Sequence, residues 1–307
     1  MMQKFNRNLR SFFKYCFRDY PHKSALWVII LVSLYTNLSL QYWKNPDRLL
    51  IWDVKSYYVY LPAVFIYHDL SLKFVERERD KIGDVMFLEE GPKGIYYNIT
   101  TYGLSLLYSP FFLSAHAYAT IANAEPTGYS PPYKFALMLS CVFYLALGLY
   151  FLLKLLMKYF PPWPTAITLI VIALGTNLYY YSTHEALMPH AYLFALISIF
   201  LYMGDRWYEK TDLKNSLILG FIIGLIILIR PVNIIILLLF ILWGVLSWRS
   251  LITRILFLIK SYKWILLMIL VTFMIWVPQF LYWKYISGNY LFYTYSDQRF
   301  FYVAGKT

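Results

Sequence analysis

Residues 135–156 read FALMLSCVFYLALGLYFLLKLL, an apolar run whose single charged side chain is Lys154. A helix needs about 20 predominantly apolar residues to cross the ~30 Å hydrocarbon core of a bilayer. This run therefore predicts a transmembrane helix.

The composition of the whole chain agrees with that reading. Of its 307 residues, 60% are apolar and only 14% are charged, and the mean hydropathy is +0.52. Soluble domains carry about 25% charged residues, because charge must cover a water-facing surface. The composition excludes a soluble enzyme or binding module and predicts an all-α polytopic membrane protein.

Seven apolar runs are candidate spans, and their boundaries follow the hydropathy. They are Ala25–Tyr42, Phe135–Leu156, Ile167–Tyr181, Ala191–Met203, Ser216–Ile229, Val232–Ser247 and Trp264–Phe280. An eighth run, Gly103–Ala122, is interrupted by Pro110 and contains several polar residues. We expect it to lie on the membrane surface.

Charge counting supports seven spans and orients them. With the N-terminus inside, the inner segments hold 15 Lys and Arg against 4 Asp and Glu, whereas the outer segments hold 13 against 12. The positive-inside rule favours this arrangement, with a cytoplasmic N-terminus. The chain then divides into a basic N-terminal segment, a first span, an outer loop with surface helices, six further spans and an outer tail. Their residue numbers are 1–24, 25–42, 43–132, 133–280 and 281–307.

The net charge of +12 does not indicate nucleic-acid binding, because the basic residues lie at the ends of apolar segments. One basic stretch, Trp248–Lys260, repeats apolar residues at helical spacing and predicts a helix lying in the interface plane.

Cys16 and Cys141 are expected on different sides of a membrane segment and indicate no disulfide. The inner connectors are short, so we expect the chemistry on the outer face.

Asp53 is the first candidate for that chemistry. It follows the first span closely, between Trp52 and Val54, where a carboxylate is partly withdrawn from water and suited to act as a general base. The alternative is a solvated aspartate paired with Lys55. Tyr57 belongs to the same aromatic stretch, which is expected to form a helix at the membrane surface. Tyr57 and Lys55 are candidates for lining the site around Asp53.

Arg230 is the second candidate, because a charged residue within membrane sequence usually faces a cavity or a partner. Its guanidinium is suited to bidentate contact with phosphate oxygens. The alternative is an arginine whose side chain reaches the outer headgroups. Arg299 and Lys284, in the outer tail, are further candidates for a phosphate contact.

An acidic residue outside the first span is followed by surface helices and then by three short motifs. These motifs are Tyr102-Gly103-Leu104 leading to Ser109-Pro110-Phe111-Phe112-Leu113, Gly224-Leu225 before Ile229-Arg230-Pro231, and Trp276-Val277-Pro278-Gln279 before Tyr282-Trp283 and Ser287-Gly288. Their order resembles the GT-C membrane glycosyltransferases, in the branch containing protein O-mannosyltransferases and the aminoarabinose transferase of lipid A.

The resemblance implies an inverting transferase in the bacterial cytoplasmic membrane. Such an enzyme moves a sugar from a polyprenyl-phosphate donor to a lipid or glycan acceptor on the outer face, and Asp53 corresponds to its general base. The resemblance also places Gln279 and Trp283 at the site. Relatives commonly carry more spans, which leaves open whether the chain is a fragment.

Two departures from the family pattern concern site residues. The basic residue expected before the Pro-Phe-Phe run is absent, and Lys93, further upstream, is the candidate for its contact with the donor phosphate. A second aspartate is replaced by a segment holding Glu185 and His190, which are candidates for lining the acceptor site. The spacing of His184, Glu185 and His190 does not suit a metal. No paired acidic motif suited to a divalent ion precedes the surface helices, so a metal-independent mechanism is preferred, with a divalent cation left open.

Two other functions fit the same sequence. A transporter or flippase of a lipid-linked sugar predicts inverted repeats and broken helices at mid-membrane, and the sequence has no visible repeat. A non-catalytic scaffold would not need an acidic residue directly outside the first span. The expected partners are the sugar donor, the acceptor and membrane lipids.

Overall fold

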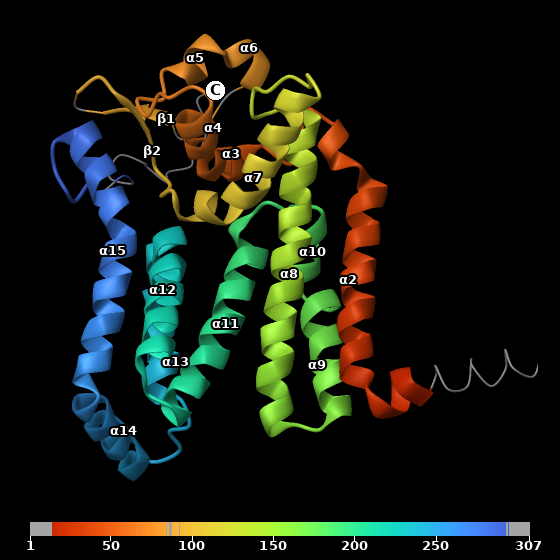
Figure 1. Ribbon diagram of the computed structural model, residues 1–307, viewed down its shortest axis with the longest axis vertical. Helices are drawn as coiled ribbons and strands as arrows, with labels where there is room; N and C mark the ends of the chain where they lie inside the picture. The colour runs from red at the N-terminus through yellow and green to blue at the C-terminus, as the bar shows by residue number, and fades with distance from the viewer. Residues whose placement is uncertain (1–13, 84, 86–87, 92, 293, 295–307) are drawn as a thin grey trace, which may run out of the picture.

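The computed structural model describes residues 14–83, 85, 88–91, 93–292 and 294, and it is predominantly helical. Figure 1 shows long helices side by side, with short elements gathered across one end. The helices along the bundle are α2 (Pro21–Leu40), α8 (Pro131–Tyr159), α9 (Pro162–Leu174), α10 (Asn177–Thr183), α11 (Pro189–Glu209), α12 (Leu213–Ile229), α13 (Ile236–Leu242) and α15 (Tyr262–Ser287). The predominantly helical fold expected from the sequence is confirmed, and a two-stranded hairpin is present besides.

The short elements lie between the first two long helices in the chain. They are α3 (Trp52–Tyr58), α4 (Tyr60–Phe65), α5 (Phe74–Arg77), α6 (Arg79–Ile82), α7 (Gly103–Ile121) and an antiparallel hairpin of β1 (Leu88–Glu90) and β2 (Tyr96–Asn98). We call this group the cap. The remaining elements are single turns or connectors: η1 (Lys14–Asp19), η2 (Tyr42–Lys44), η3 (Pro231–Ile235) and α14 (Trp248–Lys260).

Three described helices, α2 with η2, α8 and α15, are long and apolar enough to cross a bilayer. The pair α9 and α10 makes a fourth if the two helices, bent by 59°, form one broken span. Helix α12 and the segment η3–α13 are apolar but shorter. A multi-pass membrane protein is therefore supported, whereas the number of seven spans stays a prediction.

The predicted span Ile167–Tyr181 is interrupted at its centre. Gly175 ends α9, and the side chain of Thr176 caps α10 by accepting a hydrogen bond of 3.2 Å from the amide of Leu178. A threonine that caps a new helix directs the backbone out of the preceding one, which produces the bend. The predicted span Val232–Ser247 is likewise divided between η3 and α13.

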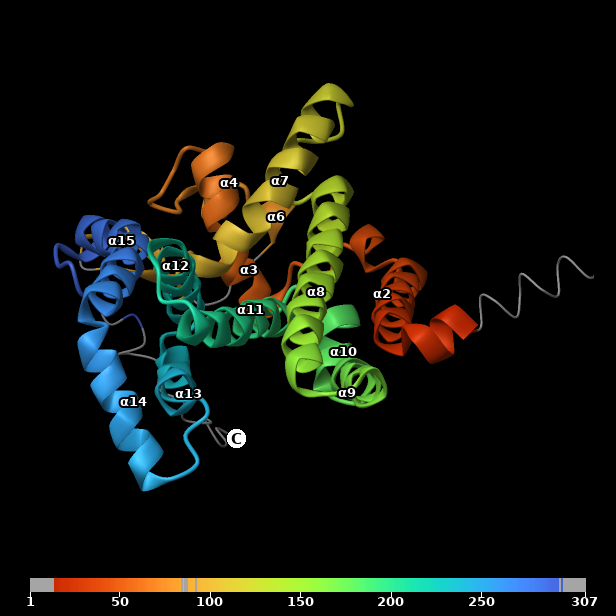
Figure 2. The ribbon, with the colours of Figure 1, turned by 60° about the horizontal axis from the view of Figure 1, so that its bottom comes forward.

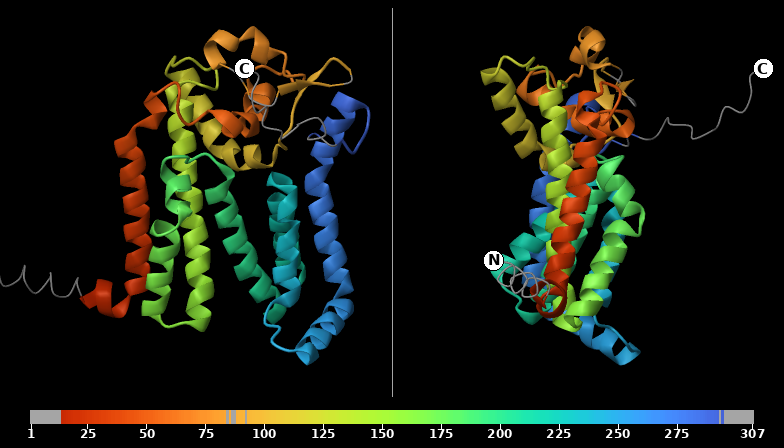
Figure 3. Two further views of the ribbon diagram at one scale, coloured as in Figure 1. Left: turned by 180° about the vertical axis from the view of Figure 1, so that it is seen from behind. Right: turned by 90° about the vertical axis from the view of Figure 1, so that its right-hand side faces the viewer.

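Helix α7 lies with the cap at the end of the bundle in both views of the long axis (Figures 1 and 3). Pro110 does not break it, contrary to the expectation from the sequence. Proline has no amide to donate to the carbonyl four residues earlier, which belongs to Leu106. The hydroxyl of Ser109 donates to that carbonyl instead, at 2.8 Å, so the helix continues.

Helix α15 packs chiefly against α12. A Cβ atom at Gly220 would lie 2.8 Å from the backbone of Met268, so the glycine permits the close approach of the two helices. Thr272 reinforces the contact by donating to the carbonyl of Gly220 at 3.0 Å. Small residues and interhelical hydrogen bonds of this kind are typical of helix pairs in membranes.

Candidate functional site

A cavity of about 810 Å³ lies where the cap meets α12 and α15. Its lining includes Asp53 and Tyr57 from α3, Thr100 and Thr101 from the segment after β2, Arg230 and Pro231 from the end of α12, Trp276, Phe280 and Trp283 from α15, and Thr294. The cavity therefore joins segments that are far apart in the sequence. We call it the cap cavity.

Asp53 lies in the first turn of α3 and is half-buried. Hydrogen bonds attach α3 to its surroundings. Ser105 on α7 donates to the carbonyl of Tyr57, and Tyr58 donates to the carbonyl of Gly128. Tyr58 is fully buried, and its burial raises the pKa of the phenol, which keeps it a hydrogen-bond donor. Asp53 is therefore carried by a well-anchored helix.

Arg230 is the residue at which α12 ends. Its backbone is extended, and Pro231 begins the short helix η3, which turns the chain back along the bundle. Proline disfavours a helical conformation in the residue before it, so the Arg-Pro pair sets this boundary. The side chain is half-buried and lines the cap cavity.

The end of α12 is held against the start of α7. A Cβ atom at Gly103 would lie 2.8 Å from the amide nitrogen of Ile229, so only glycine fits at this contact. The hydroxyl of Thr101 donates to the carbonyl of Leu228, one of the carbonyls left open where a helix ends. The Tyr-Gly and Arg-Pro motifs therefore meet in space.

Asp53 and Arg230 line the same cavity without an ion pair of their own. Among the described residues, no lysine, arginine or histidine pairs with Asp53 and no carboxylate pairs with Arg230. A half-buried charge without a counter-ion is costly to the fold, and such groups cluster at functional sites. Within the described residues no ion pair joins Lys55 to Asp53, and the Lys55 ammonium donates to the carbonyl of Ile82.

One wall of the cap cavity is aromatic. Trp276, Phe280 and Trp283 follow one another on one face of α15, with ring centroids 5.6 Å apart for Trp276 and Phe280 and 5.9 Å apart for Phe280 and Trp283. The spacing of four and three residues places side chains on the same face of a helix. The wall offers a flat apolar surface in the cavity that also holds the charged groups of Asp53 and Arg230.

Gln279 does not line the cap cavity directly. Its side chain is almost fully buried, and its Oε1 accepts a hydrogen bond of 3.2 Å from the amide of Tyr102. The hydroxyl of Tyr102 donates to the carbonyl of Ile275 at 2.6 Å. Burial raises the pKa of Tyr102 to about 12. Gln279 is therefore a positioning residue between the cap and α15.

Lys93 is directed elsewhere than to the cap cavity. Its ammonium donates to the carbonyls of Lys284 and Tyr285, at 3.3 and 3.1 Å, near the C-terminal end of α15. A cation is favourable there because the last carbonyls of a helix lack partners. The other proposed phosphate contact, Arg299, lies outside the described residues.

Glu185 and His190 are not among the residues that line the cap cavity. His190 stacks on Tyr181 at 3.8 Å between ring centroids, and His184 stacks on Tyr180 at 5.5 Å. The amide of Glu185 donates to the carbonyl of Tyr180 in the turn after α10. This segment is the turn that connects α10 with α11. The role of Glu185 and His190 in acceptor binding stays a prediction.

Thr100, Thr101 and Phe280 were not identified from the sequence. The recurrence of aromatic residues along 276–283 was a signal that could have identified Phe280. The two threonines could not be identified, because their place depends on how the segment after β2 folds back against α12. A contact between segments so far apart in the chain leaves no pattern in the local sequence.

A second, apolar cavity of about 320 Å³ lies between the cap and α15. Leu61, Phe65 and Leu106 line it together with Tyr102 and Pro278. It shares no lining residue with the cap cavity.

Within the described ranges, no group of three or more His, Cys, Asp or Glu side chains is placed to hold a metal ion. Cys141 is buried as a free thiol. No family model, no curated protein and no solved structure matches this chain. A functional assignment therefore depends on the chemistry of the cap cavity.

Proposed function

We propose that the chain is a membrane glycosyltransferase that moves a hexosyl or pentosyl group from a polyprenyl-phosphate donor to an acceptor at the outer face of the bacterial cytoplasmic membrane. The observation that carries this proposal is the cap cavity at one end of apolar helices, which the Asp53 carboxylate and the Arg230 guanidinium line without an ion-pair partner among the described residues. Acid–base catalysis and phosphate stabilisation require these two groups.

In the proposed reaction, the Asp53 carboxylate accepts the proton of the acceptor hydroxyl. The acceptor oxygen forms a bond to the anomeric carbon from the side opposite the phosphate, which inverts the configuration. The bond from that carbon to the phosphate oxygen breaks, and its electron pair leaves with the phosphate. Arg230 stabilises the negative charge that develops there.

The remaining parts of the donor have complementary surfaces nearby. The aromatic wall of Trp276, Phe280 and Trp283 suits the apolar face of a sugar ring, and the separate apolar cavity between the cap and α15 suits prenyl units. Lys93 is not needed in this arrangement, because its ammonium is bound to carbonyls of α15.

The test is to reconstitute the purified protein in lipid nanodiscs with a panel of polyprenyl-phosphate sugars and to detect transfer or donor hydrolysis by mass spectrometry. Asp53→Asn removes the base but keeps the size of the side chain. We expect it to lower the rate by about 10²- to 10⁴-fold while donor binding is retained.

The control is Asp47→Asn, an exposed aspartate in the loop between α2 and α3. It should leave the rate unchanged. Equal rates for wild-type protein and Asp53→Asn would contradict the catalytic role of Asp53. Movement of donor across the bilayer without any chemical change would identify a flippase instead.

A further inference from the structure

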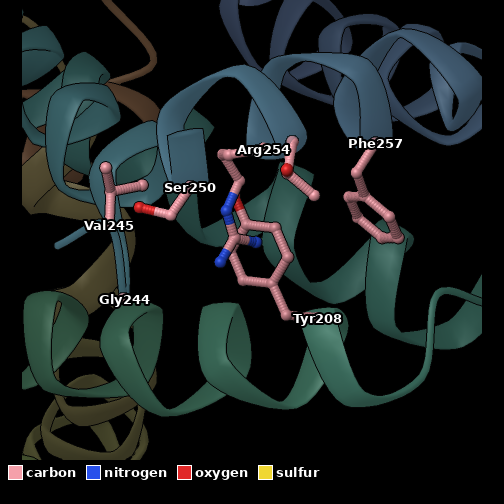
Figure 4. A pocket seen from close by; sticks show the side chains of 7 residues that line it. Tyr208, Gly244, Val245, Ser250, Arg254 and Phe257 are labelled. Atoms are coloured by element: carbon pink, nitrogen blue, oxygen red, sulfur yellow. The ribbon is translucent and has the colours of Figure 1, made fainter. Parts of the chain in front are cut away.

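A third cavity, of about 410 Å³, lies between α11 and α14 at the end of the bundle opposite the cap (Figures 1 and 4). Tyr208 reaches it from α11, and Ser250, Thr253 and Arg254 reach it from α14. None of these residues belongs to the cap cavity. We call it the α14 cavity.

Arg254 is the charged group of the α14 cavity. Its guanidinium lies over the ring of Tyr208, 3.6 Å from the ring centroid, and one terminal nitrogen donates to the carbonyl of Trp243 at 2.6 Å. These contacts fix the guanidinium against the ring of Tyr208. Neither of them supplies a negative charge to pair with it. Within the described residues, no carboxylate pairs with it.

The acidic residues of the neighbouring elements are already engaged. Asp205 on α11 accepts hydrogen bonds from Lys158 at 2.7 Å, from Trp243 at 3.0 Å and from Tyr159. Glu209 pairs with the same lysine at 2.9 Å. The sequence contains no Asp or Glu from 213 to 296, so α14 and its flanks carry positive charge alone.

Helix α14 has an apolar face that nothing in the described structure covers. Trp248, Ile252, Ile255 and Ile259 recur at helical spacing and are exposed, Trp248 by 76% and Ile259 by 62%. Figure 2, which brings this end forward, shows α14 beside α13 and running into α15, and Phe257 of α14 contacts Trp207 and Tyr208 of α11. Ser247 caps its first turn by accepting from the amide of Ser250 at 3.2 Å, so the helix is well formed.

Exposed basic residues accompany this apolar face. Arg249 and Lys260 lie on α14, and Lys263 follows it at the start of α15. An amphipathic helix with basic flanks binds the boundary between headgroups and acyl chains, and each Lys or Arg near an anionic surface contributes about 1 kcal/mol. Anionic headgroups are the complement of this charge pattern.

We propose that α14 lies on an anionic membrane surface and that the α14 cavity binds the phosphate of a phospholipid headgroup, with Arg254 as its principal contact. Ser250 and Thr253 line the same cavity, but their hydroxyls already donate to the carbonyls of Ser247 and Arg249, at 2.8 and 3.0 Å, so Arg254 supplies the charge for the phosphate. This end of the bundle is then the cytoplasmic one. The inference does not depend on glycosyl transfer.

The test uses the full chain in nanodiscs of phosphatidylcholine with or without 30% phosphatidylglycerol. Bound lipid is counted by native mass spectrometry, and backbone protection over 246–260 is followed by hydrogen exchange. We expect phosphatidylglycerol to be retained in preference to phosphatidylcholine and to slow exchange in α14. Arg254→Gln should weaken its binding about fivefold, the loss expected for one charge near the surface.

Arg254 also contacts Trp243, so a second variant separates binding from folding. Arg249→Gln combined with Lys260→Gln removes two exposed charges that make no packing contact in the core. It should weaken binding at least as much. Lys73→Gln, exposed at the cap, is the matched control and should change nothing.

Three results would overturn the proposal. Equal retention of the two lipids would show that charge does not matter at α14. Equal effects of Arg254→Gln and Lys73→Gln on phosphatidylglycerol binding would show that the lipid does not bind in the α14 cavity. Displacement of the lipid by millimolar inorganic phosphate would identify a site for a soluble anion.

Discussion

The backbone amide of Tyr102 donates a hydrogen bond to the side chain of Gln279, 3.2 Å away, although the two residues lie in distant parts of the sequence. The hydroxyl of Tyr102 reaches the same helix at Ile275. The segment entering α7 is thereby attached to α15 close to Trp276 and Trp283. This pair of contacts sets the distance between the cap and the aromatic wall.

Replacing Gln279 with Leu tests the importance of that attachment. The substitution leaves the amide of Tyr102 without its acceptor in a buried place, which costs about 1–3 kcal/mol. We expect a lower midpoint of thermal unfolding in detergent. Leu281→Met, exposed on the same helix, should stay within about 0.5 kcal/mol of the wild-type protein. Similar midpoints for both variants would contradict a structural role for Gln279.

Arg230 should govern the affinity for the phosphate of the donor. Arg230→Gln removes the charge, and we expect donor binding to weaken by about 1.5–3 kcal/mol, the range for a hydrogen bond to a charged group. Arg230→Lys keeps the charge but loses the planar fork, so it should recover only part of the affinity. Titration of a polyprenyl phosphate by microscale thermophoresis measures both.

Arg77→Gln provides the control for Arg230. Its side chain is 63% exposed in the cap and lies outside the cap cavity. The affinity for polyprenyl phosphate should be unchanged in this variant. An equal loss in Arg77→Gln and Arg230→Gln would mean that the effect is general surface charge rather than contact in the cavity.

Trp276 should contribute to binding of the sugar more than to binding of the phosphate. Trp276→Ala removes one ring of the aromatic wall, and the loss expected for a stacking contact is about 0.5–1.5 kcal/mol. Comparing the affinities for polyprenyl phosphate with and without its sugar isolates the contribution of Trp276 to sugar binding. Trp163→Ala, at an exposed position on α9, should affect neither ligand. A loss shared equally by the two ligands would argue against a sugar contact.

Alkaline pH should loosen the contact between the cap and α15. Burial raises the pKa of Tyr102 to about 12, above its ordinary value of 10.0. The folded state therefore favours the neutral phenol, so this stabilisation is complete below pH 10 and is lost as the pH rises through about 12. Tyr102→Phe should unfold with a weaker dependence on pH between 10 and 12.

The control for this titration is Tyr285→Phe, which changes an exposed tyrosine near the end of α15. Its stability should follow the wild-type curve over the same range of pH. Circular dichroism at a fixed temperature in detergent records the helix content of all three proteins. Superimposable curves for Tyr102→Phe and the wild-type protein would contradict the prediction.

Local signals in the sequence were sufficient to predict the long helices and α14. The bounds Trp248–Lys260 match the predicted helix, because a period of 3.6 residues and a serine cap are properties of one short segment. The bend at Gly175 and the continuation of α7 through Pro110 differed from expectation. In both places a single side chain, of Thr176 or Ser109, supplies the hydrogen bond that decides the outcome.

The sequence by itself determined that this chain is helical and suited to a membrane, since apolar length and charge deficit are properties of composition and order. It also singled out Asp53 and Arg230, because a charge at the edge of an apolar run is conspicuous without coordinates. Only the tertiary structure decided that these two residues line one cavity with α15 and that Lys55 and Lys93 are directed elsewhere. Such placements depend on contacts between distant segments, which arise from close packing and leave no pattern in the local sequence.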